Sequence, residues 1–266
     1  MLKEKFFEYS FSTANDELLK IFESNHIQVV EEYFNNKTTY RVYSVKDIDK
    51  YFNDCNVLFE KKDVNKVNWL DEWKNFLKPG LLCEKIAYKN DMNVEFNKLD
   101  TIYINPSLAF GTGSHPTTFI AASLMEDICK NRIVFDVGTG SAILSILAEK
   151  LGAIKVYACD IDKNSVNNIN DNIRNNNCRK IDVYIGSIDK NYDKIKCDII
   201  VANILYDALI YLWQYMLAIL PEYIVLSGFY RLDHIDFLSN ITLNNYKIDR
   251  LFCKDNWWGI RFCRLL

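Results

Sequence analysis

The stretch Val134–Ala142 contains two glycines and two small hydroxyl residues at a spacing that suits ligand binding. It follows a short apolar strand pattern and opens an apolar helical pattern. Gly138 and Gly140 let the backbone turn sharply there and approach a ligand closely. A G-x-G pair alone is equally typical of a tight strand–helix turn that binds nothing, so the interpretation depends on a second signal.

An acidic strand end supplies that second signal. The next apolar strand pattern ends at Asp160, about twenty residues beyond the glycines, where a carboxylate can accept both hydroxyls of a ribose. This pairing is typical of a nucleotide-like cofactor at the carboxyl edge of a parallel sheet. We therefore assign the ribose contact to Asp160 and interpret Asp162 as a helix N-cap.

The residues around the glycines discriminate between two cofactors. A dinucleotide fold favours a third glycine for its pyrophosphate, whereas Ala142–Leu144 follow Gly140 and Ser141 here. Asp136, close before Gly138, would oppose a pyrophosphate but suits a cationic ligand. S-adenosylmethionine carries a sulfonium and an ammonium group and no phosphate. The spacing therefore favours S-adenosylmethionine over NAD.

Asn203 ends a later strand pattern, within the run Val201–Tyr206. Its side-chain carbonyl could accept from an amino group, and its amide could contact the cofactor. A strand-to-helix cap is the competing interpretation. The order Asn203-x-x-Tyr206 is similar to the Asn-Pro-Pro-Tyr of amide and adenine amino methyltransferases, although both prolines are missing.

A polar loop, Asn105–Thr118, precedes the first strand of this sheet and combines glycines and threonines with a His and a Phe. His115 is a candidate for orienting the loop or relaying a proton. Phe110 is a candidate for positioning an amine and stabilising its developing positive charge.

Together these stretches resemble the ribosomal protein L11 methyltransferase (PrmA) family. The family loop A-F-G-T-G-x-H-x-T-T is matched fully by Ala109–Thr118, and the motif D-x-G-x-G-S-G-I-L appears as Asp136–Leu144. Ala142 replaces the third glycine of that motif. If position 142 is helical, restoring glycine there should lose helix propensity. The remaining matches are D-I-D (Asp160–Asp162), V-A-N-I-L (Val201–Leu205) and L-S-G (Leu226–Gly228).

The resemblance implies an enzyme that methylates lysine side chains and the N-terminal amine of a large-subunit ribosomal protein, with S-adenosylmethionine as cofactor. It also implies a small N-terminal domain that grips this substrate. No metal is needed for such a transfer. The predicted catalytic residues are Asn203, His115 and Phe110, and the predicted cofactor-binding residues are Thr118, Asp136, Gly138, Gly140, Asp160 and Asn203.

Three alternatives remain open. The first is a protein lysine methyltransferase of the same fold that acts on another protein, such as the electron-transfer flavoprotein β chain. The separate N-terminal domain favours the ribosomal substrate over that one. The second is an amide-nitrogen or adenine methyltransferase, and the third is a non-catalytic binding module that kept the fold.

The predicted helices and strands fall into two parts. Residues 1–54 mix short strands and helices in a β-α-β-β-α run, which predicts a small ferredoxin-like α+β domain. The polar stretch 55–68 is interpreted as a linker, and residues 69–266 as the catalytic domain. The N-terminal strands are expected at Lys5–Phe11, Ile27–Tyr33 and Thr38–Tyr43, and the helices at Asn15–Ser24 and Val45–Phe52.

From Ile133 onward short apolar strands alternate with helices, which predicts a mostly parallel sheet covered on both faces. We expect the α/β, Rossmann-like sheet of class I S-adenosylmethionine-dependent methyltransferases, closed by a C-terminal antiparallel hairpin. The strands are expected at Leu81–Tyr88, Thr101–Ile104, Ile133–Val137, Ile154–Cys159, Ile181–Ile185, Asp198–Ala202, Tyr223–Ser227, Tyr246–Cys253 and Trp257–Arg264, and the helices around Trp69–Phe76 and at Ile143–Leu151, Lys163–Asn175 and Tyr206–Leu220.

Composition excludes several other classes. The 266 residues are 49% hydrophobic and 25% charged, and a net charge of -3 argues against direct nucleic-acid binding. No apolar run reaches the roughly 18 residues of a membrane helix. The N-terminus resembles neither a secretory signal nor a transit peptide, and the eight cysteines are scattered. We therefore expect a cytoplasmic protein with reduced thiols and no membrane partner.

Overall fold

The computed structural model describes residues 6–13, 15–25, 27, 29–34, 37–44, 46–64, 79–96, 99–105, 113–189, 195–229 and 245–265. The chain divides into two compact units, Met1–Phe76 and Leu77–Leu266. The helix expected around Trp69–Phe76 lies outside the described residues. Among the described helices, none combines the length and the apolar character that a membrane crossing requires.

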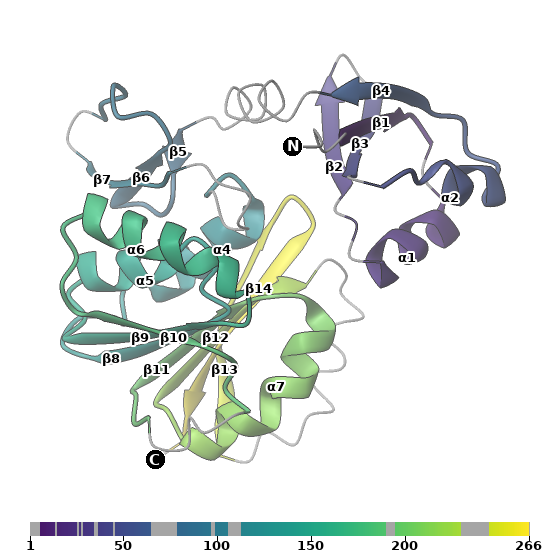
Figure 1. The fold of residues 1–266 in the computed structure, drawn as a ribbon. Coiled ribbons are helices and arrows are strands. Elements are labelled where there is room, and N and C mark those ends of the chain that lie inside the picture. The colour runs from purple at the N-terminus through teal and green to yellow at the C-terminus, as the bar shows by residue number, and fades with distance from the viewer. Residues whose placement is uncertain are drawn as a thin grey trace. The chain divides into compact units, whose positions relative to one another are not determined.

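The first unit is a small α+β domain with the element order β-α-β-β-α-β (Figure 1). Its antiparallel sheet has the strand order β2-β3-β1-β4, and residues such as Tyr9, Phe22 and Phe52 are fully buried in its core. The elements are β1 (Phe6–Phe11), α1 (Asp16–Ser24), β2 (Val29–Phe34), β3 (Lys37–Ser44), α2 (Asp49–Asp54) and β4 (Glu60–Val64).

Strand β4 corrects the prediction that residues 55–68 form a linker. It pairs with β1. It was not predicted, because its polar side chains give no apolar pattern at the edge of the sheet. Lys61 of β4 binds Asp47 and Asp49 at 2.6 and 2.8 Å, so its charge is satisfied within the domain. Helix α2 also begins later than expected, because the Asp47 carboxylate accepts the Asp49 N–H and forms a turn there.

The second unit contains a seven-stranded sheet with the order β10-β9-β8-β11-β12-β14-β13. Its first five strands are parallel, and β14 is antiparallel to both neighbours, which confirms the predicted class I α/β fold and C-terminal hairpin. The strands are β8 (Ile133–Val137), β9 (Lys155–Asp160), β10 (Ile181–Ile185), β11 (Ile199–Asn203), β12 (Tyr223–Phe229), β13 (Tyr246–Lys254) and β14 (Trp257–Arg264).

Helices cover both faces of this sheet (Figure 1). Alternate residues of the strands point to opposite faces, so Val134 and Val201 pack with one set of helices and Phe135 and Ile200 with another. The first core is shared with α4 (Pro116–Met125), α5 (Ile143–Lys150) and α6 (Val166–Asn175), and the second with α7 (Tyr206–Ile219).

Two stretches before the sheet differ from prediction. Pro116–Thr118 begin α4 rather than ending a loop, because Pro occupies the first turn and the His115 side chain caps it. The strand expected at Leu81–Tyr88 is two strands, because the N–H groups of Leu82 and Cys83 both donate to the Ile86 carbonyl and bend the chain. A small sheet results, made of β5 (Gly80–Leu81), β6 (Ile86–Lys89) and β7 (Asp100–Tyr103).

Candidate active site at the carboxyl edge of the sheet

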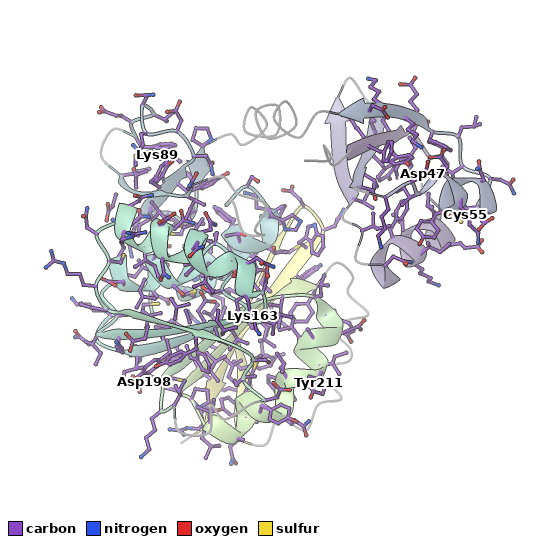
Figure 2. All side chains as sticks on the ribbon, viewed as in Figure 1. Asp47, Cys55, Lys89, Lys163, Asp198 and Tyr211 are labelled. Atoms are coloured by element: carbon purple, nitrogen blue, oxygen red, sulfur yellow. The ribbon has the colours of Figure 1, made fainter. Side chains whose placement is uncertain are left out.

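Those predicted site residues that the structure describes lie at one edge of the large sheet. After β8 the chain continues to β9 and β10 on one side, and it then returns to β11 on the other side of β8. Ligands of open α/β sheets bind at such a switch point, outside the carboxyl ends of the strands. Figure 2 marks both edges: Lys163 follows the carboxyl end of β9, and Asp198 precedes the amino end of β11.

The glycine turn is fixed to the end of β9 by its own N–H groups. The N–H groups of Gly138 and Thr139 both donate to the Cys159 carbonyl at 2.9 Å. The Gly140 N–H donates to Oδ2 of Asp160 at 2.8 Å. Gly138 and Gly140 have φ values of 75° and 57°, a region that favours glycine. The structure therefore places Asp160 beside the turn, as the spacing predicted.

Asp160 also holds the chain that follows β9. Its Oδ1 accepts the Asp162 N–H at 2.9 Å, and the Asp162 carboxylate in turn accepts the Asn164 N–H at 2.8 Å. Asp162 is thus the N-cap of the 3-10 helix η1 (Lys163–Ser165), as predicted. Because each carboxylate oxygen has two lone pairs, Asp160 retains the capacity to accept further hydrogen bonds.

Asp136 is buried within the turn. Its Oδ2 accepts the hydroxyls of Thr139 and Ser145, both at 2.6 Å. Burial and, to a smaller extent, the nearby charge of Asp160 raise the pKa of Asp136 to about 6, although the two hydrogen bonds favour the charged form. The contacts in the structure make Asp136 a support for the turn and for the start of α5.

Ala142 adopts the left-handed conformation at the N-cap of α5, with φ of 68° and ψ of 16°. This conformation costs a residue with a Cβ about 1–2 kcal/mol relative to right-handed geometry. Position 142 is therefore not helical, and the expected loss of helix propensity on restoring glycine does not apply there.

Thr118 and Asn203 meet although 85 residues separate them in sequence: Nδ2 of Asn203 donates to Oγ1 of Thr118 at 3.4 Å. Thr118 is fully buried in the first turn of α4. The adjacent residue, Thr117, accepts the Ser227 hydroxyl at its carbonyl oxygen at 2.9 Å, which ties α4 to β12. The L-S-G motif thus helps to place Thr118 next to Asn203.

His115 serves as the N-cap of α4. Its Nδ1 accepts the Thr117 N–H at 3.3 Å and lies 2.7 Å from the Thr117 hydroxyl. Its ring contacts Trp257 of the C-terminal hairpin edge-on, with 4.8 Å between the ring centroids. Burial lowers the pKa of His115, which favours the neutral ring. The third predicted catalytic residue, Phe110, lies outside the described residues.

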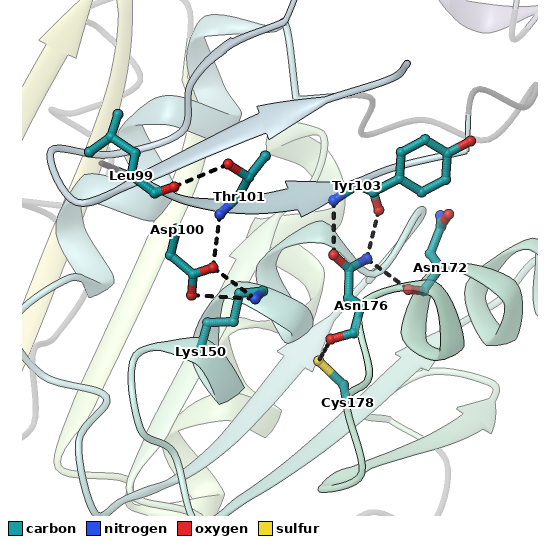
Figure 3. A network of polar contacts seen from close by, with 8 residues as sticks. All are labelled: Leu99, Asp100, Thr101, Tyr103, Lys150, Asn172, Asn176 and Cys178. Atoms are coloured by element: carbon teal, nitrogen blue, oxygen red, sulfur yellow. Dashed lines mark hydrogen bonds and ion pairs between the residues drawn. The ribbon is translucent and has the colours of Figure 1, made fainter. Parts of the chain in front are cut away.

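Asn172 of α6 supports the glycine turn, and Asn176, the C-cap of the same helix, holds β7; neither residue was predicted from the sequence. Nδ2 of Asn172 donates to the Ser141 carbonyl at 2.9 Å, and its Oδ1 accepts the Asn105 N–H at 2.8 Å. Asn176 accepts the Tyr103 N–H and donates to its carbonyl at 2.8 and 2.6 Å (Figure 3). Their spacing of four residues on a helix was the available signal, because it places both amides on one face.

The chain is similar to known proteins over most of its length. A family model described as ribosomal protein L11 methyltransferase (PrmA) matches residues 6–264. The chain is 37% identical over 186 residues to the ribosomal protein L11 methyltransferase of Caldanaerobacter subterraneus subsp. tengcongensis, covering 68% of this chain and 59% of that protein. It is 32% identical over 251 residues to that of Thermosipho melanesiensis, covering 90% of this chain and 95% of that protein.

The extent of similarity varies among relatives. In three matches the chain spans only between 49% and 59% of the relative's length. Among solved structures, the ribosomal protein L11 methylase of Lactobacillus delbrueckii subsp. bulgaricus superimposes with a TM-score of 0.63 at 31% identity. That superposition covers 71% of this chain and 99% of the other.

Proposed function

Because the chain belongs to the ribosomal protein L11 methyltransferase (PrmA) family, we propose that it transfers methyl groups from S-adenosylmethionine to amino groups of ribosomal protein L11. The substrate amines are lysine side chains and the N-terminal amine, and the reaction takes place in the cytoplasm. One structural observation carries the proposal: Asp160, the glycine turn and the Thr118–Asn203 pair meet at the switch point of the sheet.

The charges at this edge fit S-adenosylmethionine. Asp160 lies close enough to Asp136 for its charge to raise the pKa of Asp136. Two neighbouring carboxylates would repel a pyrophosphate and attract a sulfonium or ammonium group. The donor set therefore suits this cofactor, which supplies an electrophilic methyl group when it is bound.

We assign the cofactor contacts by the same chemistry. Asp160 accepts the ribose hydroxyls, and the main chain at Gly138 and Gly140 approaches the cofactor closely because these residues carry no Cβ. Thr118 and Asn203 complete the site on the other side of β8. Asp136 acts through the turn that it holds.

Orientation of the amine is the main catalytic task of the chain, and it can contribute several kcal/mol. Nδ2 of Asn203 is oriented by Thr118, so the Asn203 carbonyl oxygen is the acceptor for an N–H of the substrate amine. Only a neutral amine can attack, and a free lysine has a pKa of about 10.4, so a site of low polarity favours the reactive form. We assign His115 to positioning, because its Nδ1 caps α4.

Methyl transfer to purified large ribosomal subunits tests the proposal. With radiolabelled S-adenosylmethionine, we expect label in L11 alone, and Asn203→Ala should reduce the initial rate at least tenfold. Ile219→Ala, a change in a partly buried side chain of α7, serves as the control for general damage. Label in a different protein of a whole-cell lysate, with none in L11, would favour the same-fold lysine methyltransferase instead.

A further inference from the structure

Ile204 follows Asn203 and lies between two glycines, Gly138 and Gly228. Gly138 comes directly after β8, Gly228 lies in β12, and β11 runs between these two strands. A Cβ built on Gly138 would lie 2.3 Å from Cγ2 of Ile204, and one built on Gly228 would lie 2.4 Å from the Ile204 carbonyl oxygen. Both distances are far below van der Waals contact, so only glycine fits at either position.

The two glycines contact different parts of Ile204. Gly138 faces its side chain, and Gly228 faces its main chain. Both glycines also have positive φ values, 75° and 117°, which glycine adopts without steric cost. Because a β-branched side chain is stiff at χ1, the Cγ2 methyl cannot easily swing away from Gly138.

We propose that Ile204 is a positioning residue that sets Asn203 in register with the cofactor turn. The inference rests on the proposed function, in which Asn203 accepts the substrate amine. Contact between the Ile204 side chain and Gly138 fixes the distance from the end of β11 to the glycine turn. The close approach of Gly228 to the Ile204 carbonyl oxygen prevents the main chain after Asn203 from shifting. A misplacement of about 1 Å at such a site can cost a hundredfold in rate.

The first test compares two truncations of Ile204 with a matched residue. Ile204→Ala removes the Cγ2 contact, whereas Ile204→Val keeps it. We expect Ile204→Ala to lower kcat about tenfold at saturating cofactor, and Ile204→Val to stay within twofold of wild type. Ile219→Ala, also partly buried in the same core, should lower Tm without lowering kcat well below Tm. An Ile204→Ala enzyme with wild-type kcat would overturn the proposal.

The second test uses the difference between the two glycine contacts. Gly138→Ala should lower Tm, and adding Ile204→Ala should restore part of that loss because the clashing methyl is gone. Gly228→Ala should not be rescued by Ile204→Ala, because its clash is with a carbonyl oxygen that every residue has. Equal rescue of both glycine variants, or rescue of neither, would contradict the proposed packing.

Asn203→Ala separates this inference from the function on which it depends. If Asn203→Ala abolishes transfer while Ile204→Ala is fully active, only the positioning role fails. If Asn203→Ala retains wild-type kcat, the role of Asn203 and the positioning role both fail. Loss of kcat in Asn203→Ala and in Ile204→Ala, with activity kept in Ile204→Val, is the supporting result.

Discussion

Among the single residues, Asp160 has a structural role and a proposed cofactor-binding role in this site. It holds the Gly140 N–H and the Asp162 N–H, and it is the proposed acceptor for the ribose. We expect Asp160→Ala to weaken S-adenosylmethionine binding by about 1.5–3 kcal/mol, the usual contribution of a hydrogen bond to a charged group. Isothermal titration measures the change. Asp162→Ala, which removes only a cap, should bind normally, and unchanged affinity in Asp160→Ala would remove the ribose assignment.

Ala142 gives a prediction about stability. Because Ala142 is left-handed, Ala142→Gly should raise the free energy of unfolding by about 0.5–1 kcal/mol, as strain is relieved and the greater entropy of unfolded glycine offsets part of the gain. Urea unfolding measures it. Ala148→Gly, inside α5, should instead destabilise by about 1 kcal/mol. A loss of stability in both variants would show that the turn tolerates alanine without strain.

Asp136 makes stability depend on pH. Its pKa is raised from 3.8 to about 6, so the native state binds a proton that the unfolded state releases between these values. Stability contributed by this group therefore falls as pH rises from about 4 to 6, by on the order of 3 kcal/mol. Asp136→Asn should lack this decrease, so its stability relative to wild type should increase across that window in urea unfolding. A constant difference between the two proteins would contradict the raised pKa.

At the scale of elements, the C-terminal hairpin braces helix α4. Arg261 of β14 donates to the Leu124 carbonyl at 2.9 Å and to Asp249 of β13 at 2.5 Å, and it forms an ion pair with Asp127. We expect Arg261→Leu to lower the free energy of unfolding by about 2–3 kcal/mol, because it removes charge-assisted hydrogen bonds at a largely buried position. Arg174→Ala, at an exposed pair, should change it by less than about 0.5 kcal/mol.

The same brace reaches the other end of α4. Trp257 contacts His115 at the N-cap, and Gly259 lies against Ile120 and Leu124. Because Thr118 lies in the first turn of α4, the hairpin contributes indirectly to the placement of the Thr118–Asn203 pair. Thermal unfolding of Arg261→Leu with and without S-adenosylmethionine shows whether cofactor stabilisation is retained when the brace is weakened.

Because the molecule consists of two compact units, we expect cofactor binding and recruitment of L11 to be separable. Strand β4 completes the N-terminal sheet, so a cut after residue 54 would remove most of that sheet and leave one strand behind. A fragment beginning at Leu77 keeps all strands of the large sheet. We expect it to bind S-adenosylmethionine with near-normal affinity and to lose methyl transfer to L11. Circular dichroism checks that the fragment is folded. Methyl transfer to L11 at the full-length rate would contradict a role of the first unit in substrate recruitment.

The local features of this protein could be predicted from its sequence. Alternating strands and helices, the glycine turn, the acidic end of β9 and the cap at Asp162 were all predicted, because each depends on residues close together in the chain. Asn203 was predicted from its place at the end of a strand pattern, and the family resemblance added Thr118. Local patterns report which face of an element is buried, and this is enough to define the sheet and its carboxyl edge.

Several features of the site depend on how the chain packs. β4 has no apolar pattern and is a strand because β1 offers it hydrogen bonds. The left-handed conformation of Ala142 follows from the closed turn around it. His115 is the N-cap of α4 because the helix begins at Pro116. Ile204 packs tightly against Gly138 and Gly228, which lack a Cβ that would clash with it. The pairing of β4 with β1 and the contacts of Ile204 with Gly138 and Gly228 join residues far apart in sequence, so no local pattern could specify them.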